Sequence, residues 1–95
     1  MKITKKQALI IGKKLKINFD VVNIDEWVYG LNVELEHGRK FGMITNITNN
    51  SVLLTAKIVI AHLLEYPDYY KRLKKLEDSA EKYWKNKKEK NIFLE

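Results

Sequence analysis

One apolar segment constrains the fold more than any other feature of this chain. It runs from Val52 to Leu64 and is broken by Lys57 and His62. The segment falls well short of the roughly 20 residues that a membrane-spanning helix needs. Several of its residues favour strands, so a strand is an alternative, but the predicted element of about 14 residues, ending near Glu65, favours a helix. Because the segment is apolar nearly all round, we predict that it forms the central, most buried helix of a bundle.

A capping box predicts where the first helix begins. Thr4 is followed three residues later by Gln7, a pattern in which each side chain accepts a hydrogen bond from a free backbone N–H. Apolar residues then recur on one helical face at Ala8, Ile11 and Leu15. We expect this helix to run to about Ile17.

The second helix begins with the same kind of signal. Asn23 is a typical cap, Glu26 stands three residues later, and apolar residues continue at helical spacing as far as Leu35. Gly38 is a natural stop, and residues 39–50 are predicted to form a loop.

The fourth helix is predicted from Pro67 to about Lys88. Proline is tolerated at the first helical position, and Asp68 complements the helix dipole. An apolar stripe then follows a four–three spacing: Tyr69, Leu73, Leu76, Ala80, Tyr83 and Trp84. The sequence therefore predicts an all-α domain, a compact bundle of four helices with a buried third helix and a long basic C-terminal helix. A single domain covers residues 1–95, with its core at about 4–84 and a solvated or partner-contacting tail at 85–95.

The stripe on the fourth helix also predicts a homodimer through residues 67–88. It is longer than the other helices can cover, and it is followed by the apolar residues Ile92, Phe93 and Leu94. Monomeric proteins rarely expose so large an apolar patch, and two-fold pairing would bury it. The alternative is that this helix folds back onto its own domain and frays at its end.

Charge is concentrated at the two ends of the chain. The net charge is +6, and residues 1–16 hold six lysines and no acidic residue. These basic ends can bind nucleic acid or an acidic protein, through Lys5, Lys6, Lys13, Lys14 and Lys16 at one end and Lys71, Arg72, Lys74 and Lys75 at the other. The chain has only two arginines and no recognised nucleic-acid-binding motif, so a solvated lysine face is the main alternative.

Two Glu/His pairs form the one group of residues in the sequence that is suited to bind a metal ion or a small ligand. Glu34 and His37 lie three residues apart, as do His62 and Glu65, so each pair shares a helical face. If the two faces meet, four ligands for zinc, manganese or iron(II), or for a small molecule, converge. Gly30 would allow the helices to approach closely there. Two more carboxylates stand nearby in the sequence, at Glu36 and Asp68. The alternative is a metal-free cluster of ion pairs and hydrogen bonds.

The remaining sequence signals favour a role without catalysis. There is no cysteine, which excludes disulfides, thiolate metal sites and cysteine catalysis. Neither a phosphate-binding GxxxxGK[ST] loop nor a GxSxG elbow occurs. No signal peptide or membrane span is recognised, so we expect a cytoplasmic protein with no membrane partner.

Several strings of residues resemble a family of small proteins of unknown function from bacteria, bacteriophages and large DNA viruses. The strings are Gly30, Glu34-Leu35-Glu36-His37-Gly38, Thr45-Asn46-Ile47-Thr48, Ala56-Lys57-Ile58, Ala61-His62-Leu63 and Glu65-Tyr66-Pro67-Asp68-Tyr69-Tyr70 with Leu73. The chain departs from the family pattern at Ala56, where glycine is usual, and at residues 49–51, which replace an acidic-proline helix start. The resemblance spans about residues 8–77. The resemblance implies that six residues belong to the family pattern: Glu34, Glu36, His37, His62, Glu65 and Asp68. It also implies a viral or bacterial source. It implies no activity.

Overall fold

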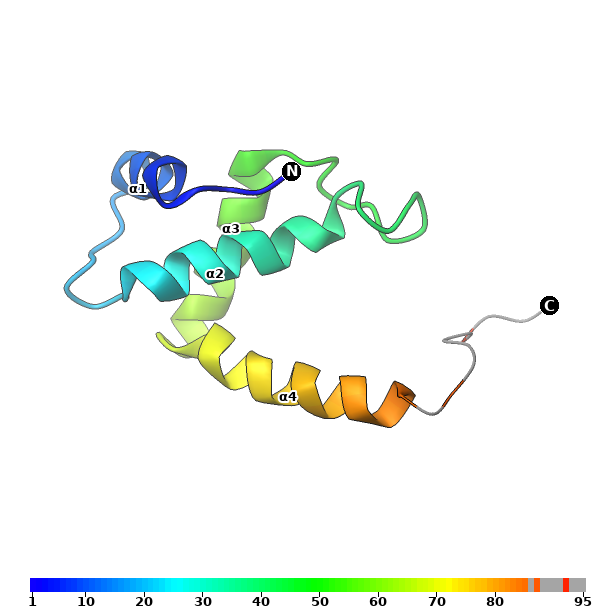
Figure 1. The fold of residues 1–95 in the computed structure, drawn as a ribbon. Coiled ribbons are helices and arrows are strands. Elements are labelled where there is room, and N and C mark those ends of the chain that lie inside the picture. The colour runs from blue at the N-terminus through cyan, green and yellow to red at the C-terminus, as the bar shows by residue number, and fades with distance from the viewer. Residues whose placement is uncertain (86, 88–91, 93–95) are drawn as a thin grey trace.

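The computed structural model describes residues 1–85, 87 and 92, and in this part of the chain it contains helices and no strand. The elements are α1 (Lys5–Lys14), α2 (Ile24–Glu34), the short 3₁₀ turn η1 (Leu35–His37), α3 (Val52–Glu65) and α4 (Tyr69–Trp84). The all-α architecture of four helices is therefore confirmed (Figure 1).

The N-terminal caps lie where the sequence signals place them. In α1 the backbone N–H of Gln7 donates to Thr4 Oγ1 at 3.2 Å, and the N–H of Thr4 donates to Gln7 Oε1 at 2.9 Å. The helix ends at Lys14, earlier than expected, because Lys16 adopts a left-handed backbone with φ of 59°. Ile17 then donates its N–H to the carbonyl of Gly12 at 2.9 Å, which closes the helix end.

The central helix is α2, since it packs against α1, α3 and α4. Trp27 and Leu31 on this helix are fully buried. The indole N–H of Trp27 donates to the backbone carbonyl of Ala8 at 2.8 Å and so joins α2 to α1. Further along, the Asn32 amide holds the backbone of Ile3 through two hydrogen bonds of 2.8 and 2.9 Å.

The third helix is buried on one side only. Thr55, Ala56, Val59 and Leu63 face the core, as expected for a buried helix. The opposite side is open: for example, Leu64 is 82% exposed. The prediction that this helix is buried is therefore confirmed for one of its faces, whereas its other face is exposed.

The fourth helix is docked at its beginning and uncovered further along. Tyr70 is fully buried, whereas Leu76 is 65% exposed. Figure 1 shows α4 running away from the rest of the bundle towards Trp84. The helix starts at Tyr69 rather than Pro67, because Pro67 and Asp68 form a turn that precedes it.

The predicted end of the fourth helix falls partly outside the described residues. Lys88, Phe93 and Leu94 lie there, while Ile92 is exposed. The homodimer through residues 67–88 stays a prediction, which light scattering coupled to size exclusion measures directly. None of the helices in the described part of the chain combines the length and apolar character that crossing a membrane requires.

Candidate functional site

The imidazole of His62 lies between two carboxylates where α2, α3 and α4 meet. Its Nε2 atom is 3.7 Å from Glu34 Oε2 on α2, and its Nδ1 atom is 3.9 Å from Glu65 Oε2 on α3 itself. Glu34 is only 5% exposed, whereas the Glu65 side chain is largely in solvent. The two carboxylates thus approach different nitrogens on opposite sides of one ring.

Two tyrosines from α4 complete this junction. The ring of Tyr69 stacks on His62, with centroids 4.3 Å apart and planes inclined by 14°. Tyr70 meets His62 edge-on at 6.2 Å and Tyr69 edge-on at 5.0 Å. We call Glu34, His62, Glu65, Tyr69 and Tyr70 the helix junction.

Gly30 makes the close approach of the helices possible, as the sequence predicts. A Cβ atom at this position would lie 2.6 Å from the ring of Tyr70 on α4 and 3.1 Å from Val59 on α3. These separations leave no room for a side chain without displacing a buried ring. The glycine therefore sets how deeply Tyr70 enters the bundle.

Burial changes the acid–base properties of the helix junction. The pKa of Glu34 is raised mainly by desolvation, and the nearby His62 opposes that shift. The pKa of the Tyr70 hydroxyl is also raised, first by burial and then by the charge of Glu34. Within the described chain, the Tyr70 hydroxyl and His62 Nδ1 are buried and have no hydrogen-bond partner. The Tyr70 hydroxyl therefore holds its proton more tightly than an exposed tyrosine does.

The predicted metal set does not converge. His37 is exposed at the end of η1, and its backbone carbonyl instead accepts N–H groups from Ile47 and Thr48 at 2.7 and 3.2 Å. Across residues 1–85, 87 and 92, no group of three or more His, Cys, Asp or Glu side chains is arranged to hold a metal ion. The physical reason is that His62 presents two different ring nitrogens to Glu34 and Glu65, rather than sharing one point with them.

The two additional carboxylates serve surface ion pairs. Glu36 lies 3.4 Å from Lys40, and Asp68 accepts a hydrogen bond from Arg72 at 2.8 Å. That hydrogen bond lowers the pKa of the Asp68 carboxyl. Neither residue points to a common ligand site with Glu34 and His62.

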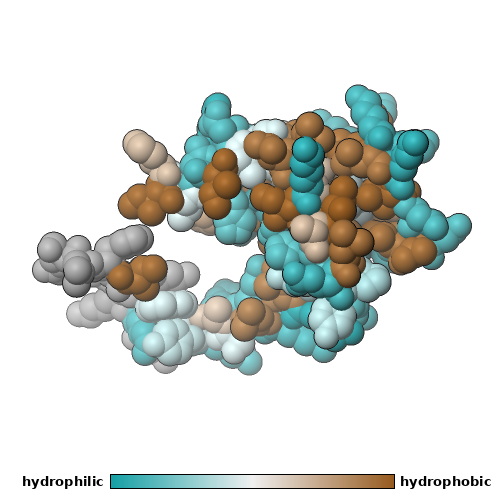
Figure 2. All heavy atoms as spheres, turned by 180° about the vertical axis from the view of Figure 1, so that it is seen from behind, coloured by the Kyte–Doolittle hydropathy of each residue, from teal (hydrophilic) through white to brown (hydrophobic). Residues whose placement is uncertain are grey.

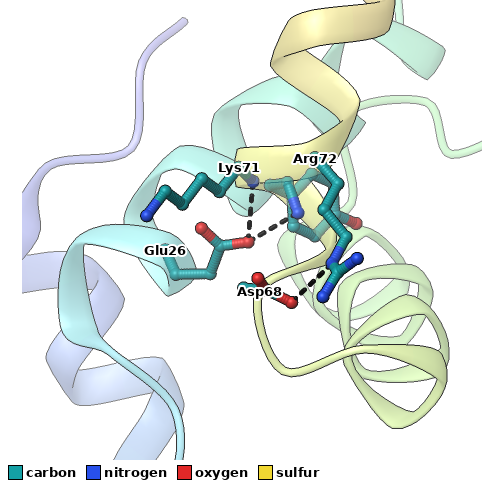
Figure 3. A network of polar contacts seen from close by, with 5 residues as sticks. Glu26, Asp68, Lys71 and Arg72 are labelled. Atoms are coloured by element: carbon teal, nitrogen blue, oxygen red, sulfur yellow. Dashed lines mark hydrogen bonds and ion pairs between the residues drawn. The ribbon is translucent and has the colours of Figure 1, made fainter.

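A residue of α2 holds the start of α4, which sequence reasoning did not predict. Glu26 Oε1 accepts the backbone N–H of Tyr70 at 2.5 Å and that of Lys71 at 3.1 Å (Figure 3). Asp68, the residue before the helix, makes no side-chain capping bond. Glu26 was expected to cap its own helix, but Asn23 alone does so, accepting the N–H groups of Asp25 and Glu26. The local pattern carries no signal for a cap that joins residues 44 positions apart.

The sequence matches the model of a protein family of unknown function over residues 8–79. The chain belongs to the DUF5661 family. No curated protein and no solved structure matches it. The predicted resemblance to a family of unknown function is therefore confirmed, whereas the viral or bacterial source stays a prediction. The DUF5661 match includes every residue of the helix junction and ends at Ser79, inside α4.

The two basic regions of this DUF5661 protein differ in how their charges are paired. On α4, Arg72 pairs with Asp68 and Lys74 pairs with Asp78 at 3.4 Å. In residues 1–16 all six lysines are exposed, and none takes part in an ion pair within the described chain: Lys2, Lys5, Lys6, Lys13, Lys14 and Lys16. The strongest uncompensated charge therefore lies on and beside α1.

Proposed function

We propose that this protein is a non-catalytic binding module that contacts an acidic segment of another protein through α1. The observation that carries the proposal is the run of six exposed lysines in residues 1–16 without an acidic neighbour in that stretch. Clustered positive charge of this kind raises the rate and strength of association with an anionic partner. Because salt screens exposed charges, such binding should weaken as the salt concentration rises, and this change can be measured directly.

The surroundings of the lysines favour an acidic protein over nucleic acid. Ile10 is half exposed on α1, four residues after Lys6 and three before Lys13. Phosphate contacts use charge and hydrogen bonds, and an apolar side chain among the lysines adds nothing to them. Neither of the two arginines lies on α1, so this helix has no guanidinium for reading bases.

The helix junction has a structural part in this proposal. Its carboxylates and imidazole point at one another rather than at a shared substrate position, and its tyrosine rings stack on His62. A metal or a small ligand would need groups that converge on one point. The junction instead links α2, α3 and α4 into one rigid support for the surface that binds.

Titration with a fluorescent glutamate oligomer tests the proposed function. We expect binding at about 50 mM salt that weakens clearly at about 200 mM. Replacing Lys6, Lys13 and Lys14 together by Gln should weaken the binding about tenfold or more, because three unpaired charges are lost. The matched control replaces Lys75 and Lys82 of α4 and Lys85, which follows that helix, by Gln. It should change the binding by less than about twofold.

Three results would contradict the proposal. One is no binding of the glutamate oligomer at low salt. Another is equal weakening in the α1 and α4 variants, which would mean that only the overall net charge acts. The third is a preference for a labelled DNA duplex with a log–log salt slope of several units, which would assign the lysines to nucleic acid.

A further inference from the structure

The uncovered side of α3 is an apolar stripe that lacks a partner within the described chain. Leu53 is 53% exposed and Leu64 is 82% exposed, and Leu54 is also open to solvent. Leu53, Lys57, Ile60 and Leu64 follow the i, i+4, i+7, i+11 spacing that brings side chains to one helical face. Ile60 is partly buried against the core, so the exposed apolar residues of this face are leucines. Apolar side chains left exposed on one side of a helix have the character of one half of a helix–helix interface.

The start of α3 lies close to α1. A shallow groove of about 190 Å³ lies between Ile10 and Ile11 of α1 and Val52 at the start of α3. Figure 2 shows apolar side chains gathered over this side of the molecule, with hydrophilic residues along its margins. We define the α1–α3 face by its exposed apolar residues Ile10, Leu53, Leu54 and Leu64 together with this groove.

Positive charge borders and interrupts the α1–α3 face. Lys57 stands at the middle of the stripe and is exposed, and Lys6, Lys13 and Lys14 flank Ile10 on α1. A second copy of the chain placed on this face would bring Lys57 and the α1 lysines of both copies together, and like charges at an interface are repulsive. The face therefore fits an occupant that is apolar on one side and acidic at its edges.

We infer that the α1–α3 face binds an amphipathic helix of a partner protein, with its apolar side on Leu53, Leu54 and Leu64 and acidic residues towards Lys57 and the α1 lysines. Seating an amphipathic helix in a groove between two helices is a recurring mode of peptide recognition. The inference rests on the proposed function, since it specifies which acidic segment α1 helps to bind.

A pair of synthetic peptides separates this inference from simple charge attraction. The probe is a labelled peptide of about 18 residues with leucines at helical spacing and glutamates on either side of them. The control peptide has the same composition in scrambled order, so its charge is unchanged and its apolar stripe is gone. We expect the probe to bind about tenfold or more tightly than the scrambled peptide, and to gain helicity on binding.

Variants with matched controls locate the binding surface. Leu53→Ser together with Leu64→Ser should weaken binding of the probe about tenfold, whereas Leu76→Ser on the exposed part of α4 should leave it unchanged. Lys57→Glu should weaken it similarly, and Lys75→Glu on α4 should have less than about a twofold effect. All of these positions are exposed, and circular dichroism of each variant verifies that the helices are retained.

The outcomes distinguish the inference from the proposed function. If the two peptides bind equally well and only the α1 lysine variants weaken them, the α1–α3 face is not the site, although α1 still binds an acidic partner. If neither peptide nor the glutamate oligomer binds, both proposals are wrong. Preferential binding to anionic phospholipid vesicles that is lost in the Leu53→Ser, Leu64→Ser variant would overturn the inference in favour of a membrane surface. A dimer mass that is lost in the same variant would overturn it in favour of self-association.

Discussion

The two sides of α3 are similarly apolar, yet they have different surroundings. On the inner side, Ala56 and Val59 are fully buried, and Val59 lies close to Gly30 of α2. On the outer side, Leu53 and Leu64 face solvent, on the helical face of Lys57, which has no ion-pair partner within the described chain. The contrast teaches that apolar character alone does not mark a core position. A side chain belongs to the core only where another element covers it, and an uncovered apolar side is a candidate binding surface.

The largest loss of stability is expected at Tyr70, in the covered helix junction. Tyr70→Ala removes a fully buried ring from the helix junction and should lower the free energy of unfolding by about 3–5 kcal/mol, measured by urea denaturation. Tyr70→Phe is the control: it removes a buried hydroxyl that has no hydrogen-bond partner in the described chain and should change the free energy by less than about 1 kcal/mol. A large loss in the phenylalanine variant would show that the hydroxyl is bonded.

Two neighbouring leucines test the comparison most directly. Leu63 faces the core and Leu64 faces solvent. We expect Leu63→Ala to cost about 2–5 kcal/mol of unfolding free energy and Leu64→Ala less than about 0.5 kcal/mol, in the same urea measurement. Similar losses for both would mean that the outer side is already covered in the isolated protein, and the α1–α3 face would then not be free.

A smaller effect is expected at the cap that joins α2 to α4. Glu26→Ala removes the acceptor for the backbone N–H groups of Tyr70 and Lys71 and should cost about 1–2 kcal/mol of unfolding free energy. Asp78→Ala, at an exposed ion pair on the same helix, is the control and should cost less than about 1 kcal/mol. If Glu26→Ala is as mild as the control, the cap does not hold α4 in place.

The dependence of stability on pH should identify the buried carboxyl. Because burial raises the pKa of Glu34 in the folded state, the folded protein holds this proton more tightly than the unfolded chain does. Protonated Glu34 therefore stabilises the folded state at low pH, and this contribution is lost as the pH rises through the folded-state pKa of Glu34. We expect Glu34→Gln to become progressively more stable than the natural protein as the pH rises above about 4, measured by melting temperature. The opposite slope would mean that the attraction to His62 exceeds the cost of burial.

The smallest effect is expected from metal ions. The helix junction offers His62 two separate carboxylates and no convergent third ligand within the described residues. Zinc, manganese and iron(II) should therefore leave the melting temperature unchanged, and a chelator should do the same. A site saturated at 100 times its dissociation constant would add about 2.7 kcal/mol, which is easily detected. A shift of that size, removed by His62→Gln, would restore the metal hypothesis.

The helices could be predicted from the sequence because their signals are local. The Thr4 capping box and the Asn23 cap each act within one helical turn, and Val52–Glu65 is one continuous segment whose length favours a helix. The proximity of Glu34, His62 and Glu65 was also predictable, since helical spacing and Gly30 both point to it. The position of His37 was not, because α2 ends at Glu34 and the following turn carries His37 to the surface.

The sequence by itself determined the all-α fold class, the beginnings of the first three helices, the family and the concentration of lysines at the N-terminus. Only the tertiary structure decided which helix is central, that Glu26 caps a helix distant in sequence, that His37 lies at the surface, away from Glu34, His62 and Glu65, and that one side of α3 stays open. The physical reason is range. Caps, turns and periodicity depend on residues within a few positions of one another, whereas burial and convergence depend on how whole helices pack against each other.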